Sequence, residues 1–264
     1  MITDAAGQLV RTLSSEAKPP KYPKDDPDDP SGEPKPDLKK DAGFNRASWD
    51  LRMEGSKRIP AKTEGTSPET GPLAPPGHYT LTLHGAGADS KATLVIEPDP
   101  RAPVTPDEVR QNVAFSLALR DAFDAVVDNV AEIAAIRTQV GDLRGRLGDD
   151  ADVTELRATA DRVLAACDTI EGELHSPKAQ VSYDVLAGRE GGAKLYSQLA
   201  FLYDSNDSSD YPPAQGLRER FDALAAELKQ RQEDLLALQN GDLALLEKQV
   251  AAAGLPRVIL PKSP

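Results

Sequence analysis

The feature that most constrains this chain is a run of apolar residues spaced mostly three and four positions apart behind a strong helix-start signal. Thr105 suits the N-cap, Pro106 suits the first helical position, and Glu108 completes a capping box. The run that follows consists of Leu119, Phe123, Val126, Val130, Ile133, Ile136, Val140, Leu143 and Leu147. Without a break before Gly148, it predicts one helix of about 40 residues, roughly 60 Å long.

A second apolar run of the same kind follows after only a few residues. Asp152 and Glu155 form another capping box, and Ser176–Pro177 ends the segment. Its repeat positions are Val153, Leu156, Ala160, Val163, Cys167, Ile170 and Leu174. The short connection predicts two antiparallel helices. Further helices are expected over 193–203 and from 217 onward, with a kink at Asn240–Gly241 and a stop at Gly254 and Pro256.

The first hundred residues have the pattern of short strands. Ile2 to Leu13 predicts a hairpin that turns at Asp4–Gly7, and 75–84 and 92–97 predict two more strands. Gly43 to Arg52 alternates in polarity around Trp49, the only tryptophan, and predicts a half-buried strand. A strand that starts at Ile2 is short, so we expect further sequence upstream, a chain truncated within a strand, and an open strand edge there.

Two polar tracts separate these strands. Residues 14–41 hold seven prolines among Lys, Asp and Glu, which predicts a disordered insertion. Residues 54–72 are the second tract, and no strand is expected in them. The predicted domains are an Ig-like β-sandwich over 1–101 that contains this insertion, an antiparallel helical bundle over 104–258, and a tail over 259–264.

Charge and composition exclude several classes of function. Residues 1–104 hold 16 acidic and 14 basic residues, and residues 105–264 hold 27 and 17. Such an acidic second half disfavours nucleic acid and anionic membrane surfaces as partners. Neither a membrane span nor a signal peptide is apparent in the sequence. One cysteine, Cys167, permits no disulfide within the chain.

Three segments together resemble a known module. They are Ile2-x-Asp4-x-x-Gly7-x-x-Val10-Arg11, Gly43-x-Asn45-x-x-x-Trp49-Asp50-Leu51-Arg52 and Pro76-Gly77-x-Tyr79-Thr80-Leu81. The chain resembles the FlgD-like Ig module and helical region near the C-terminus of bacterial sortilin-like, Asp-box (BNR) β-propeller proteins, which are often labelled glycosyl hydrolases. This resemblance implies a propeller upstream as partner and a periplasmic or secreted location. The propeller's Ser-x-Asp-x-Gly-x-x-Trp box does not occur in this sequence.

No residue pattern predicts catalysis, a cofactor or a metal. His78 and His84 would lie about 20 Å apart on one strand, and His175 suits a helix C-terminus. Cys167 occupies a core position, which favours a buried thiol. The spacing Asp204-x-Asn206-x-Ser208-x-Asp210 resembles an EF-hand loop, but it lacks the glycine and the bidentate glutamate.

Two functions remain open at this point. The first is a non-catalytic scaffold or interaction region, in which the sandwich docks to the propeller and the bundle provides an arm or a homo-oligomer interface. The alternative is part of a hydrolase that contributes a carbohydrate-binding surface, with Trp49 and Tyr79 as candidate sugar contacts. Because Trp49 shares a strand face with Ala47 and Leu51, a core position is favoured for its ring.

Overall fold

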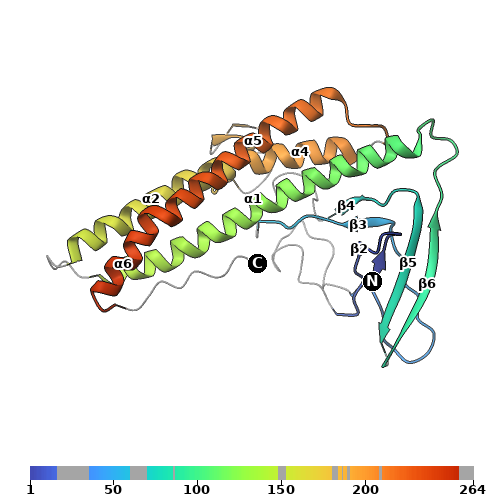
Figure 1. Ribbon diagram of the computed structural model, residues 1–264, viewed down its shortest axis with the longest axis horizontal. Coiled ribbons are helices and arrows are strands. Elements are labelled where there is room, and N and C mark those ends of the chain that lie inside the picture. Colours follow the sequence, from blue (N-terminus) through green and yellow to red (C-terminus); the bar gives the residue numbers. More distant parts are fainter. Residues whose placement is uncertain are drawn as a thin grey trace. The chain divides into compact units, whose positions relative to one another are not determined.

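The computed structural model describes residues 1–16, 36–59, 70–85, 87–147, 153–179, 184–185, 187–188, 191–207 and 210–255. The fold is α+β, with small antiparallel sheets followed by helices (Figure 1). The strands are β1 (Ile2–Thr3), β2 (Leu9–Arg11), β3 (Arg52–Glu54), β4 (Thr70–Leu73), β5 (Gly77–Gly85) and β6 (Ala88–Ile96). The helices are α1 (Pro106–Arg146), α2 (Thr154–Leu174), α4 (Leu195–Asp207), α5 (Gln215–Leu238), the π-helical turn η3 (Gln239–Leu243) and α6 (Ala244–Ala252).

The chain divides into two compact units. The sheet unit comprises Met1–Ser56, Ser67–Arg120 and Tyr203–Ala214, and the helical unit comprises Lys57–Thr66, Asp121–Leu202 and Gln215–Pro264. The sheet unit therefore includes the first turns of α1 and the last turn of α4. The expected boundary near residues 101–104 concerns which part folds independently, and it stays a prediction.

The four-stranded sheet of the sheet unit has the order β2-β1-β5-β6, and every pair in it is antiparallel. The predicted hairpin of β1 and β2 is confirmed. Asp4 Oδ1 accepts hydrogen bonds from the backbone N–H groups of Ala6 (2.9 Å) and Gln8 (2.8 Å), and Gly7 adopts φ +80°. Because β1 lies between β2 and β5, Ile2 does not lie at an open edge, and among the described residues the edges of this sheet are β2 and β6.

The core of the sheet unit is a small cluster centred on Tyr79. Four of its side chains are buried, namely Ile2, Val10, Ala74 and Tyr79. Leu13, Trp49, Met53, Leu81, Leu94 and Ile96 are partly buried and pack against these four. The Tyr79 hydroxyl donates a hydrogen bond to the Pro75 carbonyl, so the polar tip of this buried ring has a partner.

The predicted strand over Gly43–Arg52 is wrong, because residues 43–51 form no strand and β3 begins only at Arg52. Side-chain hydrogen bonds close a turn there instead. Asp50 Oδ1 accepts from the Arg52 N–H (3.0 Å), and the Trp49 indole N–H donates to the Arg52 carbonyl (2.8 Å). Leu51 adopts φ +61°, a conformation that strands do not use.

Strand β4 lies in the tract that was expected to contain no strand. It pairs with β3, with Arg52 opposite Leu73 and Glu54 opposite Thr70. A side chain at Gly71 would collide with the Met53 carbonyl, so this close approach of two backbones requires glycine.

The predicted insertion over 14–41 falls partly on residues 17–35, outside the described part of the chain. The described residues on either side of that gap contact each other. The Ser14 carbonyl accepts from the Leu38 N–H (3.0 Å), and Asp37 Oδ2 accepts from the Ser14 N–H (3.2 Å). The insertion therefore leaves and rejoins the sheet unit at neighbouring points.

The long helix predicted after Thr105 is confirmed as α1, which spans 41 residues. The Thr105 hydroxyl accepts from the Glu108 N–H (3.3 Å), and the Glu108 carboxylate accepts from the Thr105 N–H (2.7 Å). All nine apolar repeat positions between Leu119 and Leu147 are buried. The hydrogen bond from Thr105 also contributes to the lowered pKa of Glu108.

Helix α2 runs antiparallel to α1 within the helical unit. Arg137 pairs with Asp168 (2.9 Å), and Arg144 pairs with Asp161 (2.7 Å). An advance of seven residues along α1 therefore corresponds to a step of seven residues backward along α2, as expected for antiparallel helices. The repeat positions of α2 that are buried are Leu156, Ala160, Val163, Cys167, Ile170 and Leu174. The expected cap Asp152 lies outside the described residues, and Val153 occupies the N-cap position of α2.

The π-helical turn η3 coincides with the predicted kink at Asn240–Gly241 and joins α5 to α6. Buried leucines on either side of it, Leu238 and Leu243, are five residues apart, whereas an α-helix repeats one face every three or four. A π turn absorbs the extra residue, so Leu246 and Val250 remain buried after it. Gly254, with φ +65°, follows the end of α6.

Candidate functional site

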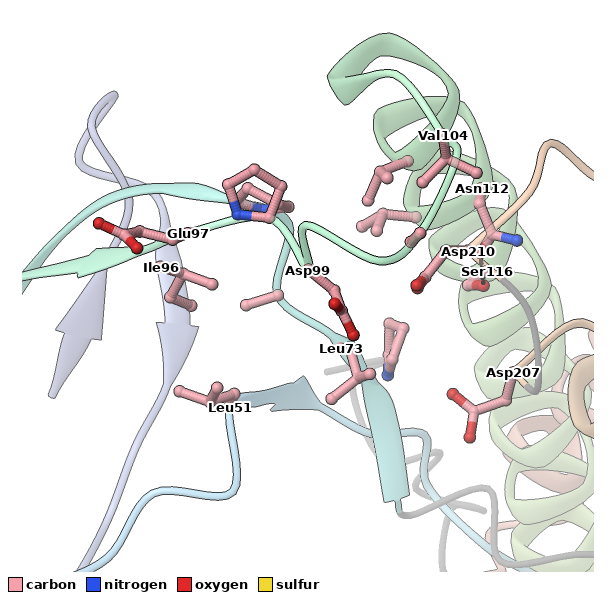
Figure 2. A pocket seen from close by; sticks show the side chains of 17 residues that line it. Leu51, Leu73, Ile96, Glu97, Asp99, Val104, Asn112, Ser116, Asp207 and Asp210 are labelled. Atoms are coloured by element: carbon pink, nitrogen blue, oxygen red, sulfur yellow. Dashed lines mark hydrogen bonds between the residues drawn. The ribbon is translucent and has the colours of Figure 1, made fainter.

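A pocket of about 160 Å³ lies in the sheet unit (Figure 2). Apolar side chains form most of its wall, and carboxylates and two neutral polar side chains complete it. The lining residues are Leu51, Pro72, Leu73, Ala74, Pro76, Ile96, Glu97, Pro98, Asp99, Ala102, Val104, Val109, Asn112, Val113, Ser116, Asp207 and Asp210. Every one of them belongs to the sheet unit.

One wall of the pocket is a single face of α1. Val109, Asn112, Val113 and Ser116 are spaced at i, i+3, i+4 and i+7, which places them in one stripe on a helix. The segment between β6 and α1 forms another part of the wall. Its shape is fixed by a turn in which the Asp99 carboxylate accepts from the backbone N–H of Arg101 (2.9 Å).

The polar side chains on the α1 side form a buried, hydrogen-bonded network. Asn206, in the last turn of α4, donates to Asn112 Oδ1 (3.2 Å) and to Ser116 Oγ (2.8 Å). Asn112 in turn donates to the carbonyl of Tyr211 (2.6 Å). Because buried amides are costly unless they are hydrogen-bonded, this network fixes the end of α4 against α1.

A salt bridge holds the opposite side of the pocket together. Arg52 of β3 donates to both carboxylate oxygens of Asp207, at 2.9 and 3.1 Å, and to the carbonyl of Gly71 (2.7 Å). The hydrogen bond to Asp207 raises the pKa of Arg52. The Tyr203 hydroxyl also donates to the carbonyl of Thr70 (2.9 Å), so β3 and β4 are both attached to the end of α4.

Three aspartates give the pocket a negative character. In Figure 2, the side chains of Asp99, Asp207 and Asp210 are turned toward the space between Leu73 and α1, and Glu97 points away from them. Arg101 hydrogen-bonds to Asp99, with an Nη2–Oδ2 distance of 2.7 Å, and lowers the pKa of that carboxyl to about 2. Among the described residues, Asp210 forms no ion pair.

The end of α4 adds to this negative potential. A helix C-terminus carries a partial negative charge and favours cationic side chains in its last turn. The last turn of α4 has no basic residue and contains Asp204 and Asp207 instead. Arg52 offsets the charge of Asp207, and Asp204 does not line the pocket.

The two candidate sugar contacts lie next to each other in the core cluster of the sheet unit. The rings of Trp49 and Tyr79 meet edge-on, with centroids 5.8 Å apart and an interplanar angle of 67°. Tyr79 is only 4% exposed, so its ring offers no face on which a sugar could stack. Trp49 is half-buried, and carbohydrate binding at this pair stays a prediction that the burial of Tyr79 weakens.

The buried thiol expected at Cys167 is confirmed, and burial raises its pKa to about 11. One turn further along α2, Glu171 accepts hydrogen bonds from Arg137 and from His175 Nε2 (3.1 Å). On β5, His84 pairs with Asp89 of the neighbouring strand β6 (2.8 Å). Within the described ranges, no three His, Cys, Asp or Glu side chains lie close enough together to hold a metal ion.

The resemblance to an EF-hand loop also fails in the described part of that segment. Asp204 and Asn206 lie within α4, and the Asn206 side chain is 2% exposed and faces α1. An EF-hand needs these positions in a loop that wraps around the ion. Ser208 lies outside the described residues.

The pocket itself was not predicted from the sequence. Asp204 and Asp210 suggested the spacing of a calcium loop in the sequence, whereas the structure places Asp204 and Asp207 in the last turn of α4. The α1 residues of the pocket precede the apolar run that identified the helix, so the run gave no sign of them.

Comparisons with protein-family models, curated proteins and solved structures find no match to this chain. None of the helices in the described part is long and apolar enough to cross a membrane.

Proposed function

We propose that this chain is a non-catalytic interaction region, in which an Ig-like module of the FlgD type and an antiparallel helical bundle hold a β-propeller. The propeller is the partner that the sequence resemblance to the sortilin-like, Asp-box proteins implies. The bundle offers a further surface for assembly.

The observation that carries this proposal is where the polar residues of the sheet unit make their contacts. The buried or partly buried polar side chains connect structural elements: Arg52 joins β3 to α4, Tyr203 joins α4 to β4, and Asn206 joins α4 to α1. Catalytic sites instead direct such groups at a substrate. A set of polar contacts that fixes sheets to helices supports a rigid adaptor.

The experiment that tests the proposal starts from the genomic sequence that precedes the codon for Met1. If it encodes a propeller, that propeller is purified as a separate chain and its binding to residues 1–264 is measured by calorimetry and size-exclusion chromatography. We expect a stoichiometric complex, and no turnover of a panel of glycosides by residues 1–264 alone.

Two results would contradict this function. One is a purified propeller that does not bind. The other is glycoside turnover by the chain alone that a single carboxylate-to-amide substitution in it abolishes. Such turnover would favour the alternative in which the chain is part of a hydrolase.

A further inference from the structure

The size of the pocket in the sheet unit limits what it can accept. Sites for drug-sized ligands occupy about 300–1,000 Å³, whereas this pocket has about 160 Å³. An engineered apolar cavity of about 150 Å³ is known to bind benzene. The pocket therefore has room for one side chain and is too small for an oligosaccharide.

The negative charge of the pocket favours a positively charged side chain. Asp99 and Asp207 are each paired with an arginine, whereas Asp210 has no ion pair among the described residues. The C-terminal end of α4, with Asp204 and Asp207 in its last turn, adds negative potential from the backbone. Carboxylates and helix carbonyls together favour a cation.

The walls distinguish between the two basic side chains. Proline rings and aliphatic side chains make up most of the lining, among them Pro72, Pro98 and Val113. A lysine ammonium is strongly hydrated and loses much of its hydration in such surroundings. A guanidinium is planar, more weakly hydrated and able to pair with a carboxylate through two N–H groups, and the methylene groups of arginine can lie against apolar walls.

The rim of the pocket indicates that the arginine belongs to a protein. Leu51 and Leu73 stand at the pocket with 39% and 45% of their surfaces exposed. A small cation would leave these side chains in water, whereas a polypeptide that inserts an arginine would cover them with its neighbouring residues. A central anchor surrounded by an apolar, water-excluding rim is the usual arrangement of an interface hot spot.

We propose that this pocket is a docking site for an arginine side chain presented by a partner protein, with Asp210 as its main ionic contact. The proposal rests on the proposed role of the chain as an interaction region, and it names the chemistry of one contact. The arginine enters between Leu73 and α1, its guanidinium lies between Asp210 and Asp207, and apolar residues next to it in the partner cover Leu51 and Leu73.

The test uses the full chain labelled with ¹⁵N and three probes. The probes are acetyl-Leu-Arg-Leu-amide, the same peptide with the neutral isostere citrulline in place of arginine, and agmatine as a free guanidinium. Binding is followed by NMR through the side-chain amide signal of Asn112 and the backbone signals of residues 97–104. We expect saturable shifts with the arginine peptide, none with the citrulline peptide, and weaker binding of agmatine.

Matched variants locate the binding site. Asp210→Asn should weaken binding of the arginine peptide roughly five-fold, the upper range for a partly exposed ion pair. Asp222→Asn removes the same charge from an exposed position of α5 and should leave the affinity unchanged. Ala102→Trp adds bulk to the pocket wall without changing any charge, and it should abolish binding.

The inference is overturned if the citrulline peptide binds as well as the arginine peptide, or if both charge variants weaken binding equally. Unchanged binding in Ala102→Trp would place the peptide elsewhere, and agmatine binding as tightly as the peptide would make the ligand a small cation. A propeller that binds the chain while the arginine peptide does not would refute only this inference. Peptide binding without propeller binding would refute only the proposed function.

Discussion

The buried ionic group of the helical unit should make the stability of this protein depend on acid pH through Glu171. Its side chain is about 10% exposed and accepts hydrogen bonds from Arg137 and His175. Burial by itself raises the pKa of this carboxyl, and the hydrogen bonds from His175 and Arg137 outweigh that effect and lower it from 4.5 to about 2. A difference of this size corresponds to about 3 kcal/mol of stability.

The direction of the pH dependence follows from the lowered pKa of Glu171. The charged carboxylate stabilises the folded state, so its contribution is complete above pH 4.5 and is lost as the pH falls toward 2. Glu171→Gln keeps the shape and removes the charge. We expect this variant to lower the free energy of unfolding by about 3 kcal/mol at pH 7 and to match the native protein near pH 2.

The assay is urea unfolding of both proteins at several pH values between 7 and 2, followed by circular dichroism. Asp168→Asn is the control, because Asp168 pairs with the same Arg137 but its side chain is 72% exposed. That variant should lower the free energy of unfolding by less than about 1 kcal/mol at every pH. A difference between native protein and Glu171→Gln that stays constant from pH 7 to pH 2 would refute the reasoning.

Three further predictions concern the sheet unit and the insertion. Asn206→Ala should lower the free energy of unfolding by about 1–3 kcal/mol, measured by urea unfolding, because the buried Ser116 Oγ loses its donor and Asn112 Oδ1 keeps only the 3.5 Å hydrogen bond from Ser116. Gly71→Ala should lower the free energy of unfolding by about 1–3 kcal/mol, because the added side chain would collide with the Met53 carbonyl. Gly85→Ala, where a Cβ meets nothing within 4 Å, should cost much less in the same assay. Replacing residues 17–35 by a short Gly/Ser loop should change the melting temperature little, because Ser14 and Leu38 already contact each other; a drop of many degrees would show that the replaced residues pack on the fold.

The helices were predictable from the sequence because their signals are local. The capping box at Thr105 lies within four residues of the helix start, and the apolar repeat of α1 indicates which face of the helix is buried. Those residues determine the helix and its buried face together, so the prediction needed no knowledge of distant contacts.

The strands were less predictable because pairing is a long-range property. Gly43 to Arg52 alternates in polarity as a strand does, yet no strand in the described part of the chain pairs with residues 43–51. The side chains of Trp49 and Asp50 instead satisfy the backbone within a turn. Strand β4 was missed for the opposite reason, since Gly71 and Pro72 are poor strand formers in isolation. Gly71 is needed there because β3 comes so close.

Two departures from local rules mark where long-range contacts decide the structure. The five-residue interval from Leu238 to Leu243 breaks the helical repeat, and η3 accommodates it while Asp242 pairs with Arg162 of α2 (3.0 Å). The acidic last turn of α4 opposes the helix dipole, and Arg52 of β3 compensates it at Asp207. At the end of α4, the unfavourable local charge is therefore balanced by an arginine from a distant segment. At Asp210, no arginine of the described chain supplies that balance, and this difference is why the pocket beside it is expected to receive one from a partner.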